Sequence, residues 1–362
     1  MKYLIRVSRF VHARFIWLLL GSYLVAAFFP TLGLAIRSVS WGTISLPMLM
    51  LGFLLFNAGL GVDLSALRKL KGDPLPLALG LSANLIIPIC YIALVMLTMQ
   101  LWHNPDEVQH ILVGLALVAS MPIAGSSTAW SQNSNGNMAI SLGMVLCSTF
   151  LSPLATPLAL HAVGFMTTGD YSEDLHELAG SQTGWFLLIA VILPSALGIL
   201  CRQLMGKERV QARKANLKLV NSSILLLLNY SNASVSLPQA IASPDLDFLA
   251  VTLVITSFLC VTAFFAGWVI SRLQHTSKAD QIALMFGLGM NNNGTGLVLA
   301  SMALADHPGV LLPIIFYNLV QHLIAGLVDH WMFYRPGDDD SSDYPKTGKL
   351  SDYLHKLVPR RC

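Results

Sequence analysis

The chain has 362 residues and a formal net charge of +3, and 54% of its residues are hydrophobic while 11% are charged. Soluble domains carry about 25% charged residues, so water is not the main solvent of this chain, and we expect an all-α integral membrane protein. Its five cysteines show no spacing typical of a disulfide framework or a zinc site. The sequence also lacks a phosphate-binding loop and a nucleophile elbow, which argues against an enzyme.

The apolar residues form blocks that predict ten membrane-spanning helices. A helix needs about 20 mostly apolar residues to cross about 30 Å of hydrocarbon. In chain order, we expect helices at residues 15–36, 42–61, 75–101, 108–132, 137–166, 182–203, 215–240, 246–272, 279–304 and 308–334. The first apolar run is longer than a secretory signal core of about 7–15 residues, so we expect it to be retained as a span.

The charged residues divide between the two sides of this arrangement. Of the 22 Lys and Arg residues, all except Arg37 fall in the N-terminus, in alternate loops or in the tail. The opposite loops carry acids: Asp106, Glu107, Asp170, Glu173, Asp174, Glu177, Asp245, Asp247 and Asp306. Because positive residues stay in the cytoplasm, we expect a plasma (inner) membrane protein whose N-terminus, residues 1–14, and polar tail, residues 335–362, are both cytoplasmic.

The ten spans divide into two halves of five, residues 15–166 and 182–334. Polar, glycine-containing interruptions occur at residues 122–137 and 287–296, in the fourth and ninth spans. Gly125 and Asn291 are 166 residues apart, which nearly matches the offset between the two halves. An odd number of spans per half predicts an inverted repeat, and paired interruptions are typical of a transporter binding site.

A helix that breaks at membrane depth leaves backbone groups that lipid cannot satisfy. Half-helix N-termini carry partial positive charge and favour anions, whereas free carbonyls suit a cation such as Na⁺. The triplet Asn291–Asn293 is costly in an apolar span unless it faces a cavity or a partner. The alternative is that these asparagines only join their helix to its neighbours.

Several segments resemble the bile acid:sodium symporter superfamily, and the resemblance covers about residues 15–330. They are LGFLLFNAGLGVDLSALRKL (51–70), SMPIAGSSTAW (120–130), GNMAISLGMVLCSTFLSPLATP (136–157), GLGMNNNGTGLVLA (287–300) and YNLVQHLIAG (317–326) with Pro313. The resemblance implies a four-helix panel and a six-helix core, in which the fourth and ninth helices cross at their breaks. It also implies Na⁺-coupled uptake of a small organic anion by alternating access.

The resemblance places site residues at both interruptions. The implied Na⁺ ligands are Ser127, Thr128, Ser141, Met290 and Asn291. We expect the substrate to contact Ser126, Trp130, Asn292, Asn293, Thr295 and His322. No other cofactor is expected, and the expected partners are the lipid bilayer and the substrate, with no nucleic acid, in a monomer or weak homodimer.

Three positions depart from the family pattern. Gly287 replaces an expected glutamate, Val145 replaces a hydroxyl residue, and Ala83 replaces a glutamine, with Asn84 beside it. A bound Na⁺ without a carboxylate adds uncompensated charge to a low-dielectric site, so we hypothesise that at least one Na⁺ site is lost. A carrier that is independent of Na⁺, as a uniporter or through protons at His322, and an efflux permease of the arsenite-carrier type remain open alternatives, although residues 108–132 lack the cysteine of the latter.

Overall fold

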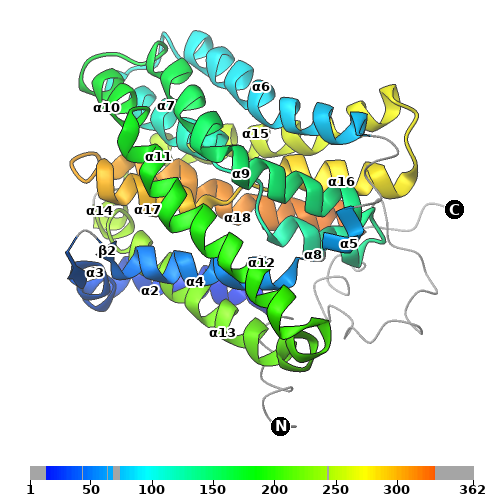
Figure 1. Ribbon diagram of the computed structural model, residues 1–362. Coiled ribbons are helices and arrows are strands. Elements are labelled where there is room, and N and C mark those ends of the chain that lie inside the picture. The colour runs from blue at the N-terminus through cyan, green and yellow to red at the C-terminus, as the bar shows by residue number, and fades with distance from the viewer. Residues whose placement is uncertain (1–13, 43, 63, 68–73, 243, 331–362) are drawn as a thin grey trace, which may run out of the picture.

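The computed structural model describes residues 14–42, 44–62, 64–67, 74–242 and 244–330, and most of them are helical. Figure 1 shows the helices packed side by side in one bundle. The first half contains α2 (Phe15–Phe28), α3 (Thr31–Ser38), β1 (Ser40–Trp41), β2 (Ile44–Ser45), α4 (Leu46–Gly61), α5 (Leu64–Leu67), α6 (Leu75–Thr98), α7 (Pro105–Ser120), α8 (Ser126–Asn133) and α9 (Met138–Gly164).

After α10 (Asp170–Leu178), the second half begins with α11 (Ser181–Leu187), the π-helical turn η2 (Leu188–Ile192) and α12 (Leu193–Met205). The remaining elements are α13 (Lys207–Ala233), α14 (Leu237–Ala242), α15 (Leu246–Leu273), α16 (Lys278–Gly289), α17 (Asn293–Ala303), the 3₁₀ turn η3 (Pro308–Val310) and α18 (Leu311–Val328). Strands β1 and β2 pair antiparallel in a short hairpin.

Five helical segments among the described residues are long and apolar enough to cross a membrane. They are Leu75–Thr98, Met138–Gly164, Thr183–Met205, Leu246–Leu273 and Pro308–Val328. A sixth candidate is the pair α2–α3, which bends by 92°. Of the remaining expected spans, the one in α13 is long but polar in its first turns, the one in α4 is shorter, and the other two are broken helices. The chain is a multi-pass membrane protein, and the ten-span inverted repeat stays a prediction.

Two of the expected spans were wrong in detail. Residues 15–36 do not form one helix, because Phe29 and Pro30 separate α2 from α3 and proline cannot continue a helix from the preceding turn. The span expected at 215–240 starts at Lys207 and ends at Ala233, since Lys, Arg, Gln and Ala are good helix formers even outside the apolar block. The expected tail, residues 335–362, lies outside the described residues.

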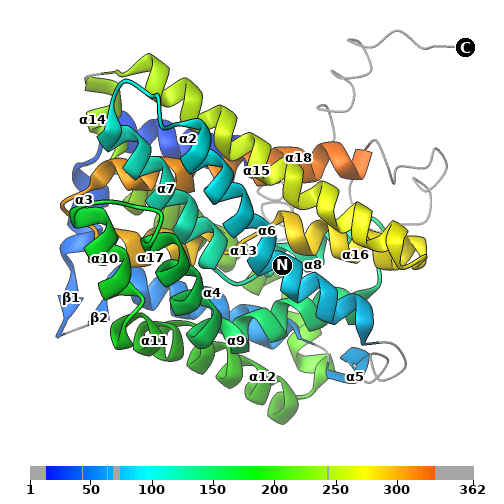
Figure 2. The ribbon, with the colours of Figure 1, turned by 90° about the horizontal axis from the view of Figure 1, so that it is seen from above.

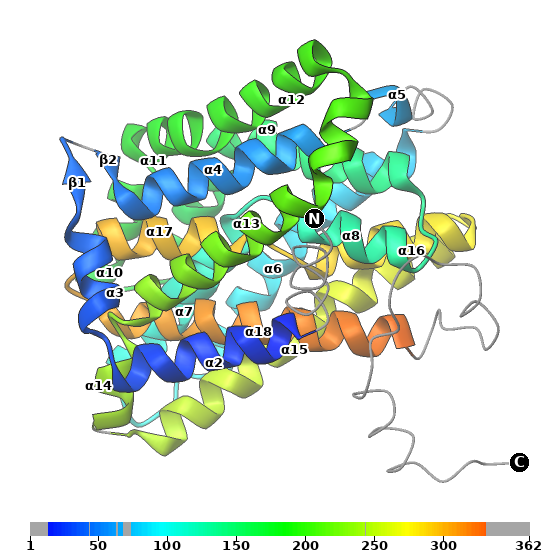
Figure 3. The same cartoon turned by 90° about the horizontal axis from the view of Figure 1, so that it is seen from below.

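The helices pack as two groups. The panel consists of α2–α4 and α11–α13, in which α12 and α13 both pack along α4. The core consists of α6–α9 and α15–α18, in which α15 packs against α6, α16 and α18. Figure 3 shows panel helices α2, α4, α12 and α13 on one face of the molecule.

Loops that are distant in sequence meet at one end of the bundle. This acidic end holds α3, α10, α14 and the turn at residues 304–310, and Figure 2 shows these helices on the same side. His307 Nε2 lies 3.5 Å from Asp174 Oδ2, and His103 Nε2 lies 3.3 Å from Asp247 Oδ2. The loops to which the sequence assigns acidic residues are therefore neighbours in space.

Candidate functional site

The two interrupted segments cross each other in the middle of the core. Ile123 and Asn291 form an antiparallel β-bridge. The N–H of Ala124 donates to the carbonyl of Met290 at 2.9 Å, and the N–H of Asn292 donates to that of Pro122 at 2.8 Å. Each break therefore satisfies backbone groups of the other, as irregular backbone at membrane depth requires.

Side chains from neighbouring helices fix the crossing. The main-chain N–H of Asn291 donates to Gln321 Oε1 at 3.0 Å, and Asn291 Nδ2 donates to the Val118 carbonyl at 3.0 Å. The N–H of Ile123 donates to Ser148 Oγ at 3.0 Å. Asn291 is therefore partly a structural residue, as the alternative interpretation of the triplet expects.

Other predicted site residues also have local roles. Asn292 caps α17, where its Oδ1 accepts from the Thr295 N–H at 3.4 Å. The Thr128 hydroxyl donates to the Gly125 carbonyl within its own turn at 2.7 Å. Met290 is fully buried, and it contributes its carbonyl to the crossing.

A set of buried polar atoms around the crossing has no hydrogen-bond partner among the described residues. These atoms are Ser127 Oγ, Ser131 Oγ, Ser141 Oγ, Asn291 Oδ1, Asn293 Oδ1, Asn293 Nδ2 and Thr295 Oγ1. An unsatisfied buried polar group costs about 1–3 kcal/mol, so a concentration of them marks atoms that are available to a ligand. They come from α8, α9, the break at Asn291 and the first turn of α17, and all are neutral.

Two predicted site residues lie beside apolar partners. The Trp130 ring stacks on Phe286, with centroids 6.0 Å apart and planes 17° apart. Ser126, one turn before Trp130 on α8, is half-buried. His322 is buried in α18, and the Phe15 ring meets it edge-on at 6.0 Å. No described contact brings His322 to the crossing loops; its neighbour Gln321 makes that contact instead.

Gly287, at the expected glutamate position, faces a methionine. A Cβ at this position would lie 2.7 Å from Met144 Cε and 2.8 Å from Met144 Sδ. Met144 comes from α9 and is fully buried, so its thioether fills the space that a longer side chain at residue 287 would need. Among the described residues, no group of three His, Cys, Asp or Glu side chains could hold a metal.

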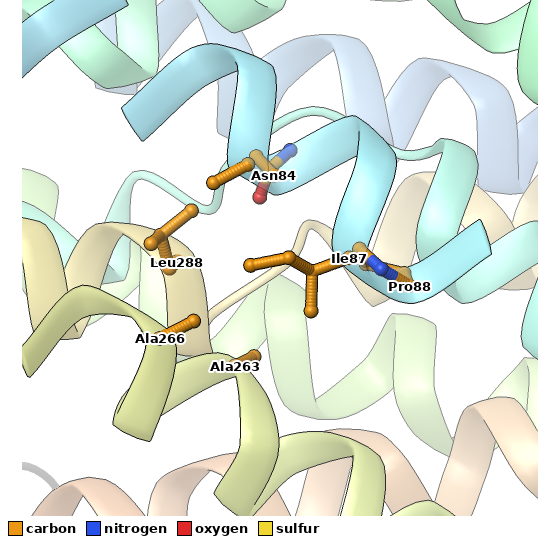
Figure 4. Close-up of a pocket in the computed structure, with 7 residues that line it drawn as sticks. Asn84, Ile87, Pro88, Ala263, Ala266 and Leu288 are labelled. Carbon is orange, nitrogen blue, oxygen red and sulfur yellow. The ribbon is translucent and has the colours of Figure 1, made fainter. Parts of the chain in front are cut away.

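A small apolar pocket lies beside this methionine, between α6, α15 and α16. Figure 4 shows Asn84, Ile87 and Pro88 facing Ala263, Ala266 and Leu288, and Ala83 completes the lining. Asn84 Oδ1 is buried and has no hydrogen-bond partner in the part of the chain that the structure describes. Ala83, at the expected glutamine position, thus lines a pocket that has one amide and no carboxylate, and Leu288, the residue after Gly287, lines the same pocket.

Sequence reasoning missed a chain of hydrogen bonds from the crossing to the panel. Gln321, which accepts from Asn291, donates to Asn318 Oδ1 at 3.2 Å. Asn318 Nδ2 in turn donates to the Tyr23 hydroxyl at 2.9 Å and to Asn229 Oδ1 at 3.1 Å. The available signal was the polar pair Asn318 and Gln321, three residues apart on one face of an apolar helix.

The comparisons with known proteins agree with this architecture. Residues 13–332 match the SBF-like CPA transporter family. The chain is 25% identical over 285 residues to the uncharacterized protein YbaS of Bacillus subtilis, covering 77% of this chain and 86% of that protein.

Two further relatives have transporter names. The chain is 24% identical to the uncharacterized sodium-dependent transporter YocS of Bacillus subtilis over 277 residues, 75% of this chain and 79% of that protein. It is 25% identical over 290 residues, 79% of this chain and 62% of that protein, to the probable chloroplastic sodium/metabolite cotransporter BASS2 of Oryza sativa subsp. japonica. These matches confirm the resemblance and the expectation of a transporter rather than an enzyme. The chain belongs to the SBF-like CPA transporter family.

Proposed function

We propose that this protein is a secondary carrier that moves a small organic anion across the plasma membrane by alternating access, with at most one Na⁺ per cycle. The observation that carries the proposal is the crossing of two broken helices beside a set of buried, neutral polar atoms without partners. Paired breaks of this kind form substrate and ion sites in secondary transporters. We further propose ten spans in two inverted five-helix repeats, with both termini cytoplasmic.

The charge of the site favours an anionic substrate. Two half-helices begin at the crossing, α8 at Ser126 and α17 at Asn293. A helix N-terminus carries about half a positive charge, and α8 has no side-chain cap on its own N-terminus. A monoanion near these ends would offset about half of the combined positive charge of the two helix ends and one bound cation.

One Na⁺ site is supported by side-chain chemistry, and a second is not. Ser127 and Ser141 supply buried hydroxyls without partners, and hard cations prefer oxygen ligands. Beside Gly287, by contrast, Met144 occupies the available space, and the pocket lined by Leu288 is apolar except for Asn84. YocS is named as a sodium-dependent transporter and BASS2 as a probable sodium/metabolite cotransporter, which is consistent with retention of one site.

Uptake into proteoliposomes tests the proposal. A panel of labelled small monocarboxylates and their neutral amides would be offered with a Na⁺ gradient or a choline gradient. We expect uptake of an acid but not of its amide, with a hyperbolic dependence on Na⁺. A sigmoidal dependence of uptake on Na⁺ would overturn the proposal of a single Na⁺ site. Equal uptake with a choline gradient would establish a carrier without Na⁺ coupling. Uptake of the amides alone would overturn the proposal of an anionic substrate.

A further inference from the structure

Arg37 has an unusual position for a cationic residue. It is the one Lys or Arg that the sequence places on the acidic side, and it lies in the last turn of α3, after the sharp bend from α2. The loops around that end carry the nine acids named above. Even so, Arg37 forms no salt bridge with any described carboxylate.

The guanidinium of Arg37 joins the panel to the core. Its Nη1 donates to Asn232 Oδ1 on α13 at 3.2 Å, and its Nη2 donates to the Ser301 carbonyl on α17 at 2.8 Å. Ser301 lies in the last turn of α17, where helix carbonyls carry partial negative charge. A guanidinium has five N–H donors, so three remain beyond these two bonds.

The two partners connect Arg37 to the proposed transport site. Helix α17 starts at the crossing, so it carries any movement there to Ser301. Asn232 lies three residues after Asn229, the residue on α13 that accepts from Asn318. Any separation of panel and core at the acidic end must break the bond from Arg37 to Ser301.

We propose that Arg37 is the gate residue of the acidic end. Its bond to Ser301 holds panel and core together in the conformation seen here, and when panel and core part, the same guanidinium binds the carboxylate of the incoming substrate. A guanidinium pairs with a carboxylate through two parallel hydrogen bonds, which the main-chain carbonyl of Ser301 cannot offer. The anion also needs a cation here because the rim is otherwise acidic. The binding step rests on the proposed function, whereas the gate does not.

Cysteine labelling in the absence of substrate tests the gate. In a variant whose native cysteines are replaced, Ser301→Cys adds a buried thiol and keeps the main-chain carbonyl that Arg37 uses. With a membrane-impermeant maleimide, we expect Arg37→Gln to speed labelling about tenfold, the effect of losing one charge-assisted hydrogen bond. Arg37→Lys should give a smaller increase.

Two controls separate the gate from a general loss of structure. Arg202 also donates to a main-chain carbonyl, that of Leu60 at 2.9 Å, but both residues belong to the panel. Arg202→Gln should therefore leave the labelling rate of the cysteine at 301 unchanged. A cysteine at the exposed Ser40 should react equally fast in all variants. If the cysteine at position 301 is labelled at the same rate with Arg37 present and in the Arg37→Gln variant, the proposed gate is overturned.

Transport kinetics test the binding of the carboxylate. We expect Arg37→Gln to raise the KM for the transported acid about tenfold, which corresponds to about 1.4 kcal/mol. Asn232→Leu removes the partner within the panel and keeps the guanidinium and its bond to Ser301, so it should leave both the labelling rate and KM unchanged. An unchanged KM in Arg37→Gln would overturn the carboxylate contact. If the unmodified protein carries no acid, the proposed function fails, and the labelling rates still decide the gate.

Discussion

A buried hydroxyl near the crossing is available to a ligand only if no protein group already forms a hydrogen bond with it. Ser141 and Thr156 both lie on α9 and are fully buried. Ser141 Oγ has no hydrogen-bond partner among residues 14–330 as far as they are described, whereas Thr156 Oγ1 donates to the Ser120 carbonyl. Their exposure is identical, so only their hydrogen bonding distinguishes a ligand from a structural group.

This contrast gives a prediction for Na⁺. We expect Ser141→Ala to raise the Na⁺ concentration for half-maximal uptake about tenfold with little change in stability, because no protein hydrogen bond is lost. Thr156→Val should instead lower the free energy of unfolding by about 1 kcal/mol and leave the Na⁺ dependence intact. Uptake and thermal unfolding measured on both variants would check this. The reverse pattern would remove Ser141 from the cation site.

A second residue-scale prediction concerns Gly287 and Met144. Gly287→Glu alone should destabilise the protein by about 1–3 kcal/mol, since the new side chain overlaps the Met144 thioether. Combining it with Met144→Ala should recover stability by making room, and the added carboxylate should make the Na⁺ dependence of uptake steeper. Thermal unfolding and Na⁺ titration of the single and double variants would check this. Equal stability of the Gly287→Glu variant and of the double variant would show that Met144 does not fill the space beside residue 287.

The pH dependence of stability contains a contribution from Asp174. Burial raises the pKa of this carboxyl above its usual 3.8, and His307 partly opposes the rise. The pKa of the carboxyl is therefore higher in the folded state than in the unfolded state, and at pH values between the two the folded state binds more protons. The free energy of unfolding falls as the pH rises through that range. We expect Asp174→Asn to make the unfolding temperature less dependent on pH in the range just above pH 4. A curve unchanged from that of the unmodified protein would contradict this.

At the scale of elements, close packing of helices in the panel depends on glycine. A Cβ at Gly198 on α12 would lie 2.9 Å from the Leu60 nitrogen and 3.0 Å from Gly59 Cα on α4. Small residues let helix backbones approach in membranes, where packing rather than water drives association. Sequence patterning places both helices but not this approach, because a helical glycine such as Gly21 can also face open space.

This packing predicts unequal effects for two glycine substitutions. Gly198→Ala should destabilise the protein by about 1–3 kcal/mol, because it overpacks the interface with α4. At Gly21 on α2, a Cβ would meet nothing within 4 Å, so Gly21→Ala should be neutral or stabilise by up to about 1 kcal/mol through helix propensity. Thermal unfolding in detergent compares the two, and similar losses at both would refute the interface argument.

The broken helices were largely predictable at this scale. The breaks at residues 121–125 and 290–292 fall within or beside the interruptions expected from sequence at 122–137 and 287–296. The bend before α3 has a signal too, since Pro30 interrupts the expected first span. Local sequence signals such as Pro, Gly and repeated Asn mark where a helix stops, although they do not show which element the free backbone then meets.

At the scale of the whole molecule, the charge distribution predicts the orientation. The described acidic loops gather at one end, and the expected spans assign all Lys and Arg residues except Arg37 to the other side. We expect a reporter fused after Arg361 to be active in the cytoplasm and one inserted after Asp170 to be exposed outside. Matched fusions with alkaline phosphatase and a fluorescent protein would check this, and an external C-terminal reporter would overturn both the orientation and the even number of spans.

The sequence by itself determined the class of protein, the position of its apolar helices, the paired breaks and the family. These properties follow from local hydrophobicity and from short motifs, which need no knowledge of distant contacts. Only the tertiary structure decided which polar atoms stay unpaired, that Met144 fills the space beside Gly287, that Gln321 rather than His322 reaches the crossing, and that Arg37 bonds to Ser301, 264 residues away. Each of these depends on which helices become neighbours, and the pattern within one helix does not contain that information.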